Sequence, residues 1–103
     1  MILELLYLAS QFVTGAVVGA AVGGAVGLVF EGIISFLNVE DEVENRALEI
    51  DDAFKWKIKS AKQNKVDVGI FDRNTNQLET LEFTSEEGIS SDVKNKVGVW
   101  QYL

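Results

Sequence analysis

The chain has 103 residues, with sixteen acidic against nine basic side chains and a net charge of −7. This balance argues against a nucleic-acid-binding protein, which needs Lys and Arg to neutralise phosphates. The chain has no Cys and no His, so disulfides, thiolate nucleophiles, and the commonest metal ligand and general base are excluded. Composition therefore favours a protein that is not an enzyme and holds no cofactor or metal.

Charge is distributed very unevenly along the chain. Residues 1–38 carry only Glu4 and Glu31, whereas residues 39–103 carry fourteen acids and all nine basic residues. A step of this size is typical of a change of solvent. We therefore predict a transmembrane oligomerisation helix in residues 1–38, an acidic linker in 39–52, and a small soluble β domain in 53–103.

Leu5 to Phe30 is a run of 26 residues without a charge. At about 1.5 Å per residue, such a helix is long enough for a hydrocarbon core of roughly 30 Å. A hairpin or re-entrant segment that breaks at Gly23-Gly24 and a soluble assembly that buries the helix are alternatives to a single span. The nearest basic residues follow the span, which places the C-terminal domain in the cytoplasm by the positive-inside rule.

Small residues recur every four positions in this segment. Helices in lipid associate through close backbone approach, and small residues at this spacing permit it. The predicted oligomer interface comprises Gly15, Gly19, Gly23 and Gly27, with Ala16, Ala20 and Gly24 beside them. The run 15–27 resembles the glycine-zipper segments of small membrane proteins that oligomerise, some of which form channels. The resemblance implies that the chain is its own partner in the bilayer.

Polar residues continue the same four-residue step at both ends of the glycine run. Gln11 precedes it, and Glu31 and Ser35 follow it. One interpretation is that Glu31 marks the membrane–water boundary. The other is that these residues face a lumen, where copies of Glu31 form an acidic ring that attracts cations.

The hydrophobic period changes to two beyond residue 52, as in half-buried strands. We predict an α+β protein in which the long helix is followed by an antiparallel β domain, an SH3-like meander or small barrel. The predicted strands are residues 54–59, 66–70, 78–83 and 97–103, with turns at 63–64 and 72–76 and a helical turn near 92–93.

Two patterns in the β domain point to ligands, and each has a simpler interpretation. Asp72, Asn74 and Asn76 match the start of a calcium-binding loop, but Gln77 and Phe83 occupy its Gly and Glu positions, which favours an ordinary polar turn. Lys55, Lys57 and Lys59 alternate along one strand. They could face anionic headgroups, but cross-strand pairs with Asp67 or the acids of residues 78–83 are the favoured prediction.

Taken together, these features predict a self-assembling small membrane protein. Its helices join copies, and its β domains are displayed for structural use or for binding an unidentified protein. The first alternative is an oligomeric channel or pore with the Glu31 ring. The second is a membrane-active toxin or stress protein.

Overall fold

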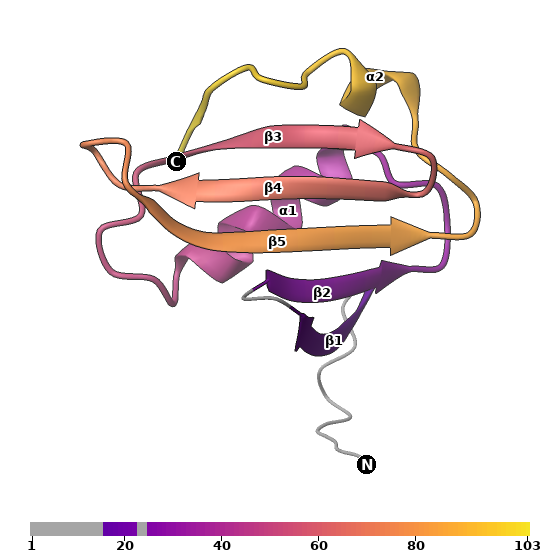
Figure 1. Ribbon diagram of the computed structural model, residues 1–103, viewed down its shortest axis with the longest axis horizontal. Helices are drawn as coiled ribbons and strands as arrows, with labels where there is room; N and C mark the ends of the chain where they lie inside the picture. The colour runs from indigo at the N-terminus through magenta and orange to yellow at the C-terminus, as the bar shows by residue number, and fades with distance from the viewer. Residues whose placement is uncertain (1–15, 23–24) are drawn as a thin grey trace.

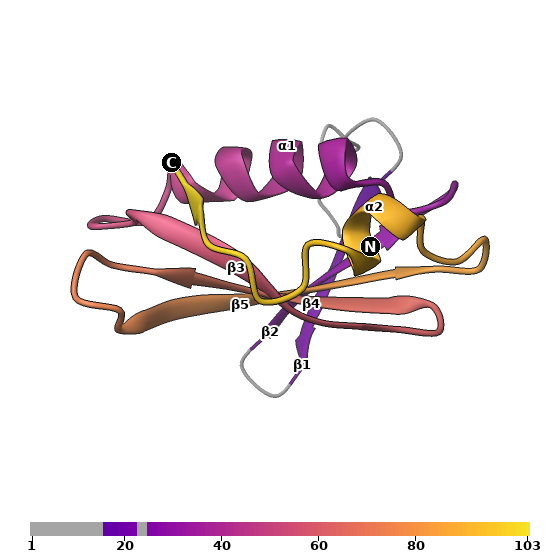
Figure 2. The ribbon, with the colours of Figure 1, turned by 90° about the horizontal axis from the view of Figure 1, so that it is seen from above.

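The computed structural model describes residues 16–22 and 25–103. The described residues form one six-stranded sheet in the order β1-β2-β5-β4-β3-β6, and both helices lie over the same face of it (Figures 1 and 2). The strands are β1 (Ala16–Val22), β2 (Ala25–Phe30), β3 (Lys55–Lys62), β4 (Lys65–Phe71), β5 (Gln77–Ser85) and β6 (Gln101–Tyr102). The helices are α1 (Phe36–Ala47) and α2 (Ser91–Lys94).

The predicted glycine-zipper helix is wrong for the residues that the structure describes. β1 and β2 pair as antiparallel strands, with Ala16 opposite Phe30 and Val22 opposite Ala25. Glycine lowers helix stability by about 1 kcal/mol relative to Ala, whereas the valines of this segment favour a pleated strand. No helix in residues 16–22 and 25–103 is long and apolar enough to cross a membrane.

The predicted antiparallel meander or barrel is also wrong, because β2 pairs in parallel with β5. β2 thereby occupies the edge of β5 that closure of a barrel would require. Among residues 16–22 and 25–103 the sheet stays open, with β1 and β6 at its two ends. Leu28 and Phe30 supply the reason, since both are buried in the core. The predicted strands at 54–59, 66–70 and 78–83 lie within or next to β3, β4 and β5, which pair antiparallel.

Helix α1 begins where the long helix was predicted to end. Ser35 caps it, because its Oγ accepts a hydrogen bond from the backbone N–H of Asn38 at 3.2 Å, the usual role of serine at this position. Val39 and Val43, one turn apart, are fully buried against the sheet. Of the acidic residues that made this stretch look like a linker, Glu40, Asp41 and Glu44 lie on the solvent side of the helix, whereas Glu42 is buried.

Trp56 of β3 lies at the centre of the core that α1 covers. It is 1% exposed, and its ring stacks on Phe36 at the start of α1, with 5.7 Å between the ring centroids. Alternate residues of the central strands join it there. The core consists of Leu28, Phe30, Ile34, Val39, Val43, Trp56, Ile58, Val66, Val68, Ile70, Leu81, Phe83 and Val93.

Candidate functional site

The sheet face opposite α1 carries the most distinctive cluster of side chains. Because Trp56 and Ile58 point into the core, the alternate residues of β3 point away from it. In register, Lys55 lies opposite Phe71 and Lys57 opposite Gly69. We call this surface the lysine–tryptophan face, and it is made by Lys55, Lys57, Lys59, Phe71 and Trp100.

Trp100 joins this face from the segment between α2 and β6. Its ring meets Phe71 edge to face, with centroids 5.0 Å apart and an interplanar angle of 85°. The ammonium groups of Lys55 and Lys57 lie 4.4 and 4.6 Å from the Trp100 ring centroid, within the range of cation–π attraction. Two cations are thus held against one half-buried indole.

Gly69 makes room for this arrangement. A Cβ added at Gly69 would stand 2.7 Å from Cε1 of Phe71 and 3.1 Å from Cδ of Lys59. The Phe71 ring and the Lys59 stem therefore lie over bare backbone in the middle of β4. This close approach explains a glycine inside a strand whose other residues suit a sheet.

The predicted pairing of the three lysines with cross-strand acids is wrong. Lys55 Nζ donates to Thr75 Oγ1 at 2.8 Å and Lys59 Nζ to Gln77 Oε1 at 3.1 Å, and Lys57 lies over the two aromatic rings. Within residues 16–22 and 25–103, no carboxylate forms an ion pair with any of these three lysines.

The acids expected to pair with them have other partners. Asp67 accepts from Ser60 Oγ at 3.0 Å, and Glu82 pairs with Lys65 at 2.8 Å. Glu79 points to the helix side of the sheet, where it binds Arg46 of α1 through two hydrogen bonds, which raise the Arg46 pKa. In the described residues the three lysines of the lysine–tryptophan face form no ion pair. Asp67 and Glu82 lie on the same face by strand register but are held by Ser60 and Lys65, and the charge of Lys55 helps to lower the pKa of Asp72.

Acidic side chains gather instead in the other layer of the molecule. Figure 2 shows α1 running across one face of the sheet, and the burial of Trp56 and Ile58 beneath the helices places the lysine–tryptophan face on the other. Its solvent side and the loop after it carry Glu40, Asp41, Glu44, Glu49, Asp51 and Asp52. Charge is therefore divided unevenly between the two sides: lysines outnumber acids on the lysine–tryptophan face, and acids outnumber basic residues around α1.

Glu42 is the one acid of α1 that is buried, with 7% of its surface exposed. This burial raises its pKa, and the charge of Asp41 adds to the shift. A folded-state pKa above the unfolded value means that the folded protein binds the proton more tightly. The contribution of Glu42 to the free energy of unfolding therefore increases as the pH falls below its raised pKa, and it disappears as the pH rises above that pKa.

Glu42→Gln is expected to raise the free energy of unfolding at neutral pH by about 0.5–1 kcal/mol, a usual gain for one stabilising substitution. The gain should shrink as the pH falls and Glu42 of the wild type becomes protonated. Urea unfolding at several pH values measures it. Glu44→Gln removes the same charge from an exposed site of α1 and serves as control; an equal gain from both would contradict a role for burial.

The calcium-like sequence at residues 72–76 forms a closed polar turn. Asp72 Oδ1 accepts from the backbone N–H groups of Asn74 and Asn76 at 2.9 and 2.8 Å, and Oδ2 accepts from Asn76 Nδ2 at 3.1 Å. The backbone hydrogen bond from Asn76 is the main cause of the lowered Asp72 pKa. The Asp72 carboxylate serves the turn, as the simpler interpretation of this sequence predicts.

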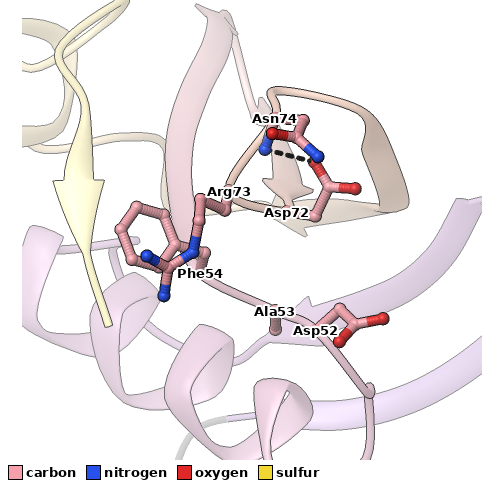
Figure 3. Close-up of a pocket in the computed structure, with 6 residues that line it drawn as sticks. All are labelled: Asp52, Ala53, Phe54, Asp72, Arg73 and Asn74. Carbon is pink, nitrogen blue, oxygen red and sulfur yellow. Dashed lines mark hydrogen bonds between the residues drawn. The ribbon is translucent and has the colours of Figure 1, made fainter.

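A shallow hollow beside this turn is drawn in Figure 3 and is lined by Asp52, Ala53, Phe54, Asp72, Arg73 and Asn74. The Arg73 guanidinium lies over the Phe54 ring, 4.8 Å from its centroid. The polar groups of the hollow do not converge on one point. In the described part of the chain, no three or more acidic side chains gather as a metal site.

The residues of the predicted oligomer interface do not share one helix face. Ala16, Gly19 and Ala20 belong to β1 and Gly27 to β2, while Gln11, Gly15, Gly23 and Gly24 lie outside the described residues. Glu31 is exposed in the bend after β2, and Ser35 caps α1. The helical geometry that would align Glu31 and Ser35 along a lumen is absent from these residues.

Sequence analysis found the lysines of the site but missed the residues that organise them. The alternation of Lys55, Lys57 and Lys59 was visible, whereas Trp100 lies 41 residues or more from each of them in the chain. Comparison with protein-family models, with curated proteins and with solved structures finds no match for this chain.

Proposed function

We propose that this protein is a self-assembling, membrane-associated structural or interaction protein whose copies join edge to edge through β1. The observation that carries this proposal is the position of β1 at the end of the sheet. An edge strand offers a row of backbone donors and acceptors to another strand. β1 has the sequence Ala-Val-Val-Gly-Ala-Ala-Val, without the charged residues or proline that usually block such pairing.

The two ends of the sheet contrast in this respect. β6 is only two residues long, and a very short strand is itself a protected edge. β1 is seven residues long. Antiparallel pairing of two β1 strands about a two-fold axis uses both β1 edges at once. The far end of each sheet then offers only β6 and the part of β3 beyond it, whose lysines oppose further pairing. The proposed assembly is therefore a dimer with one continuous sheet, which displays two copies of the α+β body.

The membrane association in this proposal is supported by the sequence, which carries no charge from Leu5 to Phe30. Within that run, Leu28 and Phe30 serve the protein core, so the support comes from the residues before β2. The pore alternative depended on a helix that aligns Glu31 with the glycines, so the described residues give it no support. The toxin alternative stays a sequence prediction. The strand-paired dimer is favoured over both because the strand that it would use, β1, belongs to the described backbone.

The double variant Ala16→Lys/Ala20→Lys tests the proposal. Lysines on an edge strand oppose pairing with a second edge, so the variant is expected to be monomeric where the wild type is a dimer, as measured by sedimentation equilibrium in mild detergent. The matched control, Leu37→Lys/Leu48→Lys, adds the same charge at side chains that are 63% and 86% exposed and should remain dimeric.

A second variant distinguishes strand pairing from packing around glycine. Gly19→Val adds a β-branched side chain, which favours a strand and would separate two close-packed backbones. The dimer should therefore persist in Gly19→Val. A monomeric wild type, or a dimer unaffected by Ala16→Lys/Ala20→Lys, would refute the proposal.

A further inference from the structure

The lysine–tryptophan face has three lysines that form no ion pair within residues 16–22 and 25–103. Lys55, Lys57 and Lys59 project from one strand, and their polar contacts in the described residues are neutral groups and aromatic rings. The chain as a whole carries a net charge of −7, so acids are not scarce. Many of them lie around α1, and by strand register this face carries Lys55, Lys57, Lys59 and Lys65 against Asp67 and Glu82. The excess of lysines makes it a patch of positive potential, which an anionic partner would complement.

The same side of the sheet becomes apolar toward its other edge. By register with β5, Ala25, Gly27 and Val29 of β2 lie on the face that also carries Thr80, Glu82 and Thr84. Val29 is 50% exposed. The face thus passes from the lysines of β3, across charged and polar residues of the central strands, to β2, where Ala25 is buried and Val29 is exposed.

Trp100 adds a feature typical of a lipid interface. Its ring is half-buried against Phe71 and two ammonium groups, and its chain neighbours Val97 and Val99 are 40% and 45% exposed. Tryptophan and lysine are enriched where proteins meet lipid headgroups, because each combines an apolar body with a polar end.

We propose that the lysine–tryptophan face binds the anionic headgroups of a membrane surface, with α1 and its acidic side chains turned away from the bilayer. This orientation follows from the charge polarity of the molecule, because the reverse would bring the acids of α1 against negative lipids. The inference rests on the membrane association in the proposed function and names the surface and lipid class that carry it. It does not depend on the β1 dimer.

Vesicle flotation with the full chain tests the inference. Vesicles of phosphatidylcholine alone are compared with vesicles that contain about 30% phosphatidylglycerol. The negative surface of the second kind should raise the binding constant about five-fold for each lysine that lies near it. The wild type should prefer the anionic vesicles, and this preference should weaken at high salt, which screens the attraction.

The double variant Lys57→Gln/Lys59→Gln should lower binding to the anionic vesicles by about 25-fold, or about five-fold per lysine. The control Lys94→Gln/Lys96→Gln removes the same net charge from α2 and the residues after it, where Lys96 lies over Phe36 on the helix side. The control should keep the preference for anionic lipid. Equal losses in both variants, or no loss in either, would overturn the inference.

Tryptophan emission gives a second readout. Trp56 is 1% exposed and should report only the intact core, whereas Trp100 should shift to shorter wavelength on anionic vesicles. The shift should vanish in Trp100→Phe. Emission that does not change on vesicles that bind the protein would overturn the inference.

The same variants separate lipid from a second copy as the occupant of this face. If Lys57→Gln/Lys59→Gln abolishes self-association without vesicles, the face binds the acidic layer of another copy, and the lipid inference is wrong. A monomeric wild type that still prefers anionic lipid would defeat only the β1 dimer. A dimer without that preference would defeat only this inference.

Discussion

Trp56→Ala is expected to lower the free energy of unfolding by about 3–5 kcal/mol, the range for deleting a buried indole. Trp56 is 1% exposed and stacks on Phe36, so the cavity would open between β3 and the start of α1. Domains of this size have total stabilities of about 5–15 kcal/mol. The variant should therefore lose a large fraction of the total stability. Urea unfolding followed by far-ultraviolet circular dichroism measures the change.

Trp100→Ala is the control for this prediction, because it removes the same side chain from the other face of the sheet. Trp100 is only half-buried, so less apolar surface returns to water and the expected cost is about half as large or smaller. Equal costs for the two substitutions would contradict the assignment of Trp56 to the core and Trp100 to the exposed face.

Gly69→Ala is expected to disturb the lysine–tryptophan face and to cost about 1–3 kcal/mol of stability, as overpacking commonly does. The new Cβ would stand 2.7 Å from the Phe71 ring. That ring cannot move freely, because Trp100 packs against it at 5.0 Å. Phe71 and Trp100 should shift together, which a red shift of Trp100 emission and weaker binding to anionic vesicles would report.

Gly32→Ala provides the matched control, since a Cβ at Gly32 would meet no atom within 4 Å. It should leave both stability and vesicle binding close to those of the wild type. If Gly69→Ala were as harmless as Gly32→Ala, the close approach of the Phe71 ring to β4 would not matter for stability. The argument that Gly69 and Phe71 hold Trp100 in place would then be wrong.

The sequence predicted the central strands well because their signal is local. Lys55 to Lys59 alternate with Trp56 and Ile58, and a period of two specifies a strand with one buried face whatever its neighbours are. The polar turn at Asp72 was legible for the same reason, since its hydrogen bonds lie within five consecutive residues. Residue spacing alone therefore places the three lysines of the candidate site on one face.

The N-terminal segment was misinterpreted because its sequence supports two periods. Gly19, Gly23 and Gly27 repeat every four residues, as in packed helices, yet the intervening valines suit strands. Local propensity does not decide between them. The parallel pairing of β2 with β5 and the burial of Leu28 and Phe30 decide for strands, and both depend on residues more than fifty positions away.

By itself the sequence determined the uneven distribution of charge along the chain and the lack of Cys and His. It also determined the alternating strands and the turn at Asp72. Each of these follows from residue identity or short spacing. Only the tertiary structure decided that the sheet is open and mixed, that Glu79 turns to Arg46, and that Trp100 meets Lys55 and Lys57. The physical reason is that strand order and ion-pair choice are set by competition among distant partners, which share no periodic signal along the chain.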